Sequence, residues 1–264
     1  MAAMQRPRYR AVITGAGGGI GAAIVRELAP LTDALILVGR REGPLHALRA
    51  ELKVPVQVVC GDLTDPSTLA AIDAAARSMG GLNLLVNNAG LSDFHSFESQ
   101  PVDAIRALLD TNLLAPMLLT RQLLPQLKAA PAAQIVNVGS ALGLLGFPGF
   151  AAYGASKAGL KGFTQALRRE LSDTAVEVRS FAPRATDTAI NTDAVTAMNR
   201  ELGTAQDTPQ QVAAAFAAFL GGQRGHLTLG AKERFFVRLN GLLPAVPDAA
   251  IRKQLRIIRK YLPV

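Results

Sequence analysis

Four polar side chains could together reduce a carbonyl group or oxidise an alcohol. Tyr153 and Lys157 stand four residues apart, which on a helix places them on one face. Ser140 precedes the tyrosine by 13 residues, and Asn112 stands further upstream. Carbonyl reduction needs hydride at carbon and a proton at oxygen, and a phenol can supply that proton as a general acid. Because the ordinary pKa of tyrosine is about 10, we expect the ammonium of Lys157 to lower it.

A glycine-rich turn at residues 14–21 has the composition of a phosphate-binding loop. It follows an apolar run and opens a helical segment. Glycines there permit a sharp turn and a close approach of the backbone to a pyrophosphate, which the helix N-terminus also attracts. The spacing is T-G-x-x-x-G-x-G and not G-x-G-x-x-G, because Ile20 stands where the last glycine would be. A flexible loop would have the same composition, so the turn alone does not decide.

Two further motifs follow in order along the chain. Asn87-Asn88-Ala89-Gly90 comes after the fourth apolar run, and Tyr153-Gly154-Ala155-Ser156-Lys157 contains Y-x-x-x-K. With these motifs the chain resembles the short-chain dehydrogenase/reductase family over roughly residues 9–230. The resemblance implies that Tyr153 is the general acid and base and that Ser140 holds the substrate oxygen. It also implies that Asn112 positions a water, which relays protons through Lys157.

The resemblance also implies which residues bind a nicotinamide cofactor, in the glycine-rich turn and at the ends of later strands. They are Gly15, Gly19, Ile20, Gly21, Arg40, Asp62, Leu63, Asn88, Ala89, Gly90, Tyr153, Lys157, Pro183 and Thr188. Asp62 and Leu63 correspond to the pair that borders the adenine ring. Family members usually have glycine after the proline at 183. Here Arg184 stands there, and its side chain could face the cofactor, the substrate or solvent.

The end of the second apolar run favours NADP(H) over NAD(H). A site that prefers NAD usually places an acid there, to bind the ribose 2′-hydroxyl. In this chain the run ends in Gly39-Arg40-Arg41, and Asp33 lies before it, at the wrong end. A guanidinium at Arg40 can bind a 2′-phosphate and stack on adenine. The alternative is that both arginines are simply solvated at the start of a helix.

Short apolar runs alternate with longer helical segments along the chain. Runs of continuous hydrophobicity are typical of strands when helices cover both faces of a sheet. The expected strands are 11–14, 35–38, 56–60, 84–86, 135–138, 176–180 and 226–229, and the expected helices are 20–28, 45–52, 67–79, 101–128, 153–172 and 209–220. This alternation predicts an α/β fold, a Rossmann-like doubly wound parallel sheet of about seven strands. Residues 11–230 are predicted to form one NADP-binding oxidoreductase domain.

Composition and charge exclude several classes of protein. The chain has 264 residues, 49% of them hydrophobic, which supplies a sizeable core. The net charge is +8, but residues 1–10 contribute +3 and residues 231–264 contribute +6, leaving −1 for the body, so no nucleic-acid partner is expected. The single cysteine, Cys60, excludes an internal disulfide and is expected to be an inert buried thiol, and the three scattered histidines indicate no metal site. We expect neither a signal peptide nor a membrane span, and a cytoplasmic location.

Apolar side chains surround the expected reaction site. They are Leu142, Leu144, Leu145, Phe147 and Phe150, with Leu91 and Phe94 opposite. Some of them must pack beneath their own loop, and the others indicate an apolar ketone, aldehyde or secondary alcohol as substrate. Residues 189–207 are expected to form a lid. Two alternatives stay open: a nucleotide-binding regulatory or scaffold protein on the same fold, and an epimerase or dehydratase of the same family.

Both ends of the chain are expected to lie outside the oxidoreductase domain. Residues 1–10 form a basic N-terminal extension and residues 231–264 a basic, amphipathic C-terminal one. In the latter, Ile251, Leu255, Ile258 and Leu262 form one helical stripe between cations, with Asp248 as the expected cap and Pro263 at the end. The stripe could pack on the protein itself, lie on an anionic membrane or bind an acidic protein.

Assembly is predicted from the resemblance. The segments 101–128 and 153–172 correspond to two long helices that pair across a two-fold axis in many family members. The first segment also carries more leucines than one face of a sheet needs. We therefore expect a homodimer or a homotetramer.

Overall fold

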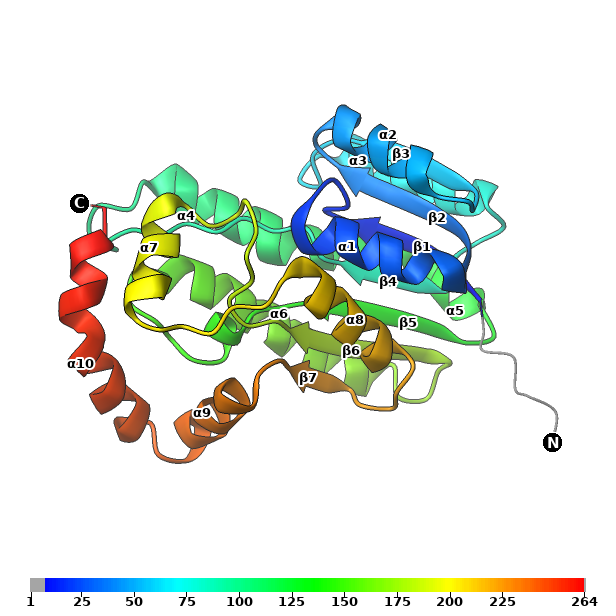
Figure 1. Ribbon diagram of the computed structural model, residues 1–264. Coiled ribbons are helices and arrows are strands. Elements are labelled where there is room, and N and C mark those ends of the chain that lie inside the picture. Colours follow the sequence, from blue (N-terminus) through cyan, green and yellow to red (C-terminus); the bar gives the residue numbers. More distant parts are fainter. Residues whose placement is uncertain (1–7, 264) are drawn as a thin grey trace.

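A parallel sheet forms the centre of the computed structural model, which describes residues 8–263 (Figure 1). Its strands within this range are β1 (Tyr9–Thr14), β2 (Thr32–Gly39), β3 (Val56–Cys60), β4 (Leu84–Asn87), β5 (Ala133–Val138), β6 (Val176–Ala182) and β7 (His226–Thr228). They are arranged in the order β3-β2-β1-β4-β5-β6-β7, and every pair is parallel. The predicted doubly wound, seven-stranded sheet is therefore confirmed.

Helices cover both faces of this sheet. In the described range they are α1 (Gly19–Leu28), α2 (Glu42–Glu51), α3 (Pro66–Ser78), α4 (Val102–Leu109), α5 (Ala115–Ala129), α6 (Ala151–Glu170), α7 (Asp193–Glu201), α8 (Pro209–Leu220), α9 (Ala231–Leu242) and α10 (Ala245–Tyr261). Two apolar cores result, one beneath α1, α2 and α8 and the other beneath α3, α5 and α6. Neighbouring strand residues such as Val12 and Ile13 enter opposite cores, because successive side chains of a strand point to opposite faces.

The order of the strands fixes where a ligand can bind. The chain passes outward from β1 to β3 and then returns to place β4 on the other side of β1. The helices that follow β1 and β4 therefore lie on opposite faces of the sheet, and ligands of such folds bind at this switch point. The glycine-rich turn follows β1, and the N-N-A-G motif follows β4.

Side chains cap the N-termini of α3 and α8, as the sequence indicates. The carboxylate of Asp65 accepts a hydrogen bond from the N–H of Ser67 at 2.8 Å, and Pro66 occupies the first turn of α3. Thr208 and Gln211 form a reciprocal capping box at the start of α8. Each satisfies N–H groups that the first helical turn leaves without a partner.

The prediction of a single helix over residues 101–128 is wrong. It is divided into α4 and α5 by a π-helical turn, Asp110–Leu114, in which the N–H of Ala115 donates to the carbonyl of Asp110. Pro116 explains the change, because it has no N–H to donate to the carbonyl of Asn112 four residues earlier. The π turn therefore places Asn112 at an irregularity of the kind often found at functional sites.

Smaller corrections concern the edges of the fold. β1 begins at Tyr9, inside the extension expected over residues 1–10, of which residues 1–7 lie outside the described range. Cys60 is exposed at the end of an edge strand, not buried. The lid segment contains a helix, α7. Asp248 does not cap the last helix, because α10 begins at Ala245 and places this residue in its first turn.

Candidate active site

Tyr153 and Ser140 meet where β5 ends and α6 begins. Ser140 follows the strand and caps a short 3-10 turn, its Oγ accepting from the N–H of Leu142 at 3.1 Å. Tyr153 lies in the first turn of α6, and its phenol lies close enough to the Ser140 side chain to be affected by it. Burial raises the pKa of Tyr153, and the hydroxyl of Ser140 opposes this more weakly. The loss of solvation is thus the largest influence on this pKa, and the lowering expected from the ammonium of Lys157 together with an oxidised nicotinamide stays a prediction.

Lys157 is buried one helical turn further along α6. Its Nζ donates to the carbonyl of Val138, at the end of β5, over 3.1 Å. Burial lowers the pKa of Lys157 to about 8, since the charged ammonium loses its hydration. An amine with a pKa in that range can gain or lose a proton near neutral pH.

Asn112 completes the set from the π turn. Its amide nitrogen donates to the carbonyl of Leu91 at 2.9 Å and to Oγ of Ser156 at 3.0 Å, and its Oδ1 accepts from the N–H of Leu91 at 2.7 Å. A Cβ at Gly90 would lie 3.1 Å from Oδ1 of Asn112 and 3.2 Å from Nζ of Lys157. Both side chains therefore converge on the backbone just after β4.

The glycine-rich turn packs closely against the N-N-A-G segment. A Cβ at Gly15 would lie 2.8 Å from Cα of Ala89, and one at Gly21 would lie 2.1 Å from the carbonyl oxygen of Gly15. Gly15 also has a φ of 66°, which side chains disfavour. The amide of Asn88 donates to the carbonyl of Thr14 at 2.9 Å and fixes the two segments together. The turn is held in a conformation that only glycine permits, as close backbone approach to a pyrophosphate requires.

Charged residues gather where β2 and β3 end. The guanidinium of Arg41 reaches to 4.0 Å from the position of a Cβ at Gly18, and Arg40 is exposed beside it. Hydrogen bonds from Thr64 and, more weakly, the charge of Arg40 lower the pKa of Asp62. Arg41 is a residue that the sequence analysis did not select, although it adjoins Arg40 in the sequence.

The structure also places Asp33 and Leu63. Asp33 stands at the amino end of β2 and pairs with Arg8, so it is remote from the glycine-rich turn. Leu63, expected beside an adenine ring, is buried in the second core. An acid at the carboxyl end of β2, of the kind that binds a ribose 2′-hydroxyl, is replaced by Gly39 and the two arginines.

The segment after β6 crosses in front of the glycine-rich turn. Pro183 accepts a hydrogen bond from the N–H of Ala141 at 2.9 Å, and Thr188 lies 3.3 Å from the position of a Cβ at Gly19. Arg184 forms two contacts with the carboxylate of Asp207, at 2.9 and 2.5 Å, and lies 3.9 Å from Glu233. The side chain of Arg184 thus joins the two ends of the lid segment to α9.

An apolar cluster surrounds the Tyr153 ring. Phe94 and Phe150 are buried in it with ring centroids 5.0 Å apart, and Leu142 and Phe147 pack against it, as expected. The cluster also receives side chains from α7 and α10 that the sequence analysis did not place there: Val195, Met198, Ile258, Tyr261 and Leu262. The stripe on the last helix was visible in the sequence, but periodicity does not say which surface a stripe covers.

The family assignment rests on sequence as well as on fold. A family model described as short chain dehydrogenase matches residues 9–199. The chain belongs to the short-chain dehydrogenases. Among curated relatives, a sulfoacetaldehyde reductase of Chromohalobacter salexigens is 38% identical over 182 residues, which are 67% of this chain and 72% of the relative.

Solved structures of short-chain dehydrogenases have the same fold. One from Burkholderia cenocepacia, in complex with NADP, has a TM-score of 0.74 and 28% identity, covering 86% of this chain and 97% of its own. Another from Burkholderia phymatum, in complex with NAD, has a TM-score of 0.78 and 26% identity, covering 88% and 92%. This short-chain dehydrogenase is therefore an oxidoreductase of a family that uses nicotinamide cofactors.

Proposed function

We propose that this protein is an NADP(H)-dependent oxidoreductase of the cytoplasm that interconverts a carbonyl and a secondary alcohol on an apolar substrate. The observation that carries the proposal is the proximity of the Tyr153 phenol to the Ser140 side chain, with the buried Lys157 one helical turn away. A bound nicotinamide would supply or accept the hydride. The remaining requirement is a proton at the substrate oxygen, and these residues can provide it.

Each polar residue then has a defined task. Ser140 donates a hydrogen bond to the substrate oxygen, and Tyr153 delivers the proton in reduction and removes it in oxidation. Lys157, whose pKa burial lowers to about 8, passes protons between the phenol and water. Asn112 holds the backbone of Leu91 with both ends of its amide and so fixes the edge of the site. The main-chain carbonyl of Asn112, to which Pro116 has no N–H to donate, is the group that would hold the relay water.

The same residues as in the sequence analysis are proposed to bind the cofactor. The close contact of the glycine-rich turn with Ala89 and Asn88 fits a pyrophosphate beside the N-terminus of α1. Arg40 and Arg41 at the end of β2 support a 2′-phosphate and hence NADP(H). Thr188, which lies against Gly19, would close the site over the nicotinamide half.

Aromatic side chains around Tyr153 support an apolar substrate. Phe94, Phe147 and Phe150 approach the phenol from the loops after β4 and β5, and the Phe150 ring lies 6.0 Å from that of Tyr153. Ligand sites of this composition bind apolar bodies and orient them through few polar groups. Here those groups are the hydroxyls of Ser140 and Tyr153.

A substrate screen with the Tyr153→Phe variant tests the proposal. Wild-type protein is expected to oxidise NADPH with some member of a panel of apolar ketones, more efficiently than NADH. The variant should lose about 10²–10⁴-fold in kcat. Its affinity for NADPH should change little, because the hydroxyl acts on the reacting oxygen. A variant that keeps more than about a tenth of wild-type kcat would refute the role of Tyr153.

The screen also separates the two alternatives. A regulatory or scaffold protein would bind NADPH but would not oxidise it, whichever ketone is added. An epimerase or dehydratase would retain nucleotide through purification and turn over without net oxidation of it. Net NADPH consumption that depends on both ketone and Tyr153 excludes each of them.

Peripheral contact with an anionic membrane is proposed through α9 and the turn to α10. The stripe first considered for this contact faces the protein, with Ile258 fully buried. Exposed apolar side chains stand instead at Phe235, Leu242, Leu243 and Val246. Within residues 8–263, no helix is long and apolar enough to cross a bilayer.

A further inference from the structure

The second half of α10 is packed into the apolar cluster that contains the Tyr153 ring. Ile258 has no exposed surface and lies in that cluster with Phe94 and Phe150. A Cβ at Gly149 would lie 2.7 Å from Cδ1 of Leu262, so the loop that leads to Tyr153 touches the end of the chain directly. The last helix thus contacts the residues that surround the phenol, although it is about 100 residues away in sequence.

Polar contacts hold this half of α10 to the lid. Figure 1 shows α10 running alongside α7, and Oε2 of Glu201 at the end of α7 accepts from Nζ of Lys260 at 2.7 Å and from Oη of Tyr261 at 2.5 Å. The carbonyl of Pro263 accepts from the N–H of Ser96 at 3.4 Å, beside Phe94. Both α7 and the segment at Phe94 are therefore hydrogen-bonded to the last few described residues.

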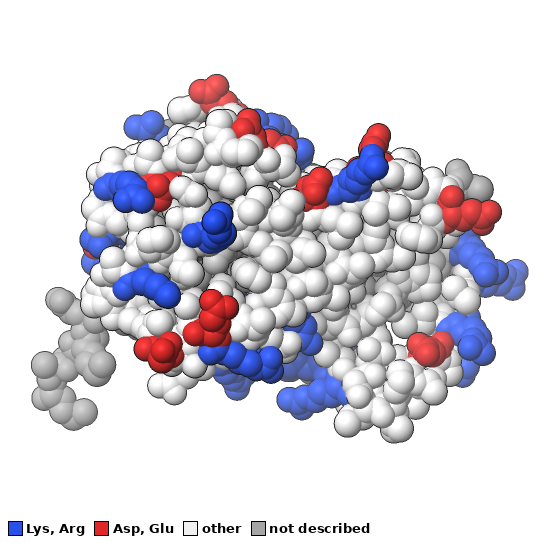
Figure 2. All heavy atoms as spheres, turned by 180° about the vertical axis from the view of Figure 1, so that it is seen from behind, with Lys and Arg blue, Asp and Glu red and all other residues white. Residues whose placement is uncertain are grey.

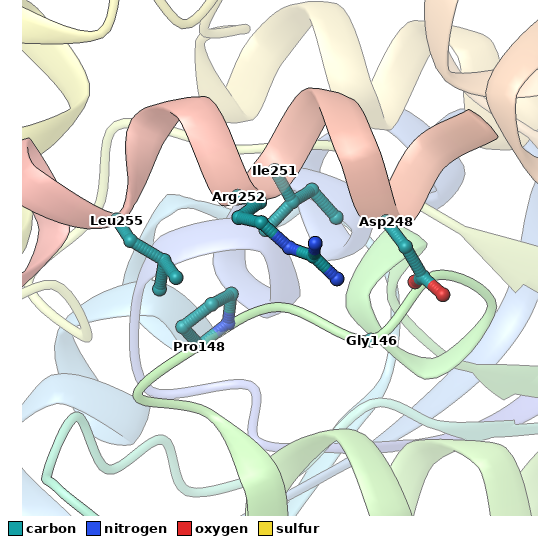
Figure 3. Close-up of a pocket in the computed structure, with 6 residues that line it drawn as sticks. All are labelled: Gly146, Pro148, Asp248, Ile251, Arg252 and Leu255. Carbon is teal, nitrogen blue, oxygen red and sulfur yellow. The ribbon is translucent and has the colours of Figure 1, made fainter. Parts of the chain in front are cut away.

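The first half of α10 is packed less closely. A surface pocket of about 340 Å³, open to solvent, lies between this part of the helix and the loop before α6, lined by Gly146, Pro148, Asp248, Ile251, Arg252 and Leu255 (Figure 3). Ile251 and Leu255 belong to the same stripe as Ile258 but remain partly exposed. The α10 helix is thus tightly packed at Ile258 and leaves a gap against the loop one to two turns earlier, at Leu255 and Ile251.

We propose that α10 is the outer wall of the substrate site, that Ile258 is a specificity-determining residue, and that Glu201 is the positioning residue that holds this wall to the lid. The proposal rests on the proposed function of the site around Tyr153. The volume at position 258 limits the size of the substrate group remote from the carbonyl. Cores are close-packed, so removing methyl groups at position 258 leaves space within the cluster that packs against Tyr153.

Truncating Ile258 tests the wall. Ile258→Val and Ile258→Ala should raise the ratio of kcat/KM for a bulky ketone to that for a small one, by about tenfold for alanine. The valine variant keeps most of the packing and protects the test against poor folding. Ile72→Val and Ile72→Ala are matched controls, because Ile72 is equally buried but belongs to α3 and to the core beneath α3, α5 and α6. The controls should leave the ratio unchanged.

Removing the carboxylate of Glu201 tests the attachment. Glu201→Ala should raise KM for the ketone several-fold, with a smaller change in kcat and none in the Kd for NADPH. Glu51→Ala is the matched control, since Glu51 pairs with Arg26 over the same 2.7 Å on the far side of the protein. Lys260→Ala with Tyr261→Phe should reproduce the effect, and combining them with Glu201→Ala should add nothing further.

The outcomes separate this proposal from the function on which it rests. If Tyr153→Phe abolishes turnover but the Ile258 variants keep the wild-type ratio, the wall is overturned and the function stands. An unchanged KM in Glu201→Ala overturns the positioning role. If Tyr153→Phe keeps its turnover of the ketone, the proposed function itself is overturned.

Discussion

Burial acts in opposite directions on the two titratable residues of the reaction site. It raises the pKa of Tyr153 and lowers that of Lys157 to about 8, because in both cases the charged form loses hydration. The protein therefore favours a neutral phenol and a lysine that is close to releasing its proton. Such a pair can deliver a proton to an oxyanion near neutral pH and be reprotonated from solvent through the lysine.

The lowered pKa of Lys157 predicts how stability depends on pH. Its pKa falls from 10.5 to about 8 on folding, so between these values the unfolded chain binds more protons, and this residue makes folding more favourable as pH rises. Below about pH 8 both states are protonated and the unfavourable burial of charge is constant. In urea unfolding, Lys157→Met should be more stable than wild type at pH 7, and this advantage should shrink by pH 9.5. An advantage that stays constant would show that the buried amine is not titrating.

Cofactor choice depends on single residues at the end of β2. Arg40→Asp should weaken NADPH binding by about 10–100-fold, since a charged hydrogen bond to phosphate is lost and a repulsive charge is added. NADH binding should change little, and fluorescence titration with both nucleotides measures the difference. Arg49→Asp, an exposed arginine on α2, is the control for a general change in charge. Equal losses for both nucleotides would make Arg40 structural and refute the NADP(H) preference.

At the scale of elements, α4 and α5 expose an apolar face. Leu109, Leu114, Met117 and Leu118 are all exposed in the single chain. Leu114 follows Leu109 by five residues across the π turn, and Met117 and Leu118 follow Leu114 by three and four. Isolated exposed leucines are ordinary, but a contiguous set on neighbouring helical turns indicates an interface. This supports the expected interface, in which the segments 101–128 and 153–172 pair with the same segments of a second copy.

Charged substitutions on this face test the assembly. Light scattering at micromolar concentration should give the mass of a dimer or tetramer for the wild type. Leu114→Glu combined with Leu118→Glu should reduce it to a monomer, because the carboxylates would be buried without partners. Leu243→Glu, at a still more exposed leucine in the turn before α10, should leave the mass unchanged. A monomeric wild type contradicts the prediction.

Elements differ in how far the sequence determines them. The inner strands could be predicted because each is buried on both faces and so reads as an unbroken apolar run. The π turn at Asn112 follows from Pro116, but a helix with an internal proline can also continue, as α5 does through Pro125. Arg179 could not be predicted: it is a fully buried cation in β6, and its guanidinium donates to the carbonyls of Phe219 and Gly222 at the end of α8. Its partners are distant in sequence.

At the scale of the whole molecule, charge is concentrated on the C-terminal extension. Residues 231–263 hold eight lysines and arginines and two acids, whereas residues 11–230 are nearly neutral. The cations of α10 face outward because its apolar stripe faces the protein: Arg252, Lys253, Arg256 and Arg259 are all exposed. Figure 2 shows lysine and arginine side chains on both sides of the uncharged tip that this extension forms at the lower right.

The apolar tip has the geometry of a surface that lies on lipid. On α9, Phe235 and Leu242 are 60% and 79% exposed and stand seven residues apart, on one stripe. Lys232 and Arg238, three residues to either side of Phe235, flank that stripe. An apolar stripe between cations is typical of helices that rest at the interface of an anionic bilayer, and an enzyme for apolar substrates would gain access to them there.

Vesicle sedimentation tests this contact without disturbing the substrate site. Wild-type protein should sediment with vesicles containing phosphatidylserine and not with purely zwitterionic ones, and salt should weaken the binding because the Debye length falls to about 8 Å at 0.15 M. Phe235→Ser with Leu242→Ser should abolish sedimentation and preserve turnover of a soluble ketone, since both side chains are exposed and neither belongs to the apolar cluster at Tyr153. Ile190→Ser is the matched control, because it removes an exposed apolar side chain from the lid and not from the tip. Binding that survives the double variant, or that is equal on zwitterionic vesicles, would place the contact elsewhere and leave the cations of α10 as a solvated surface.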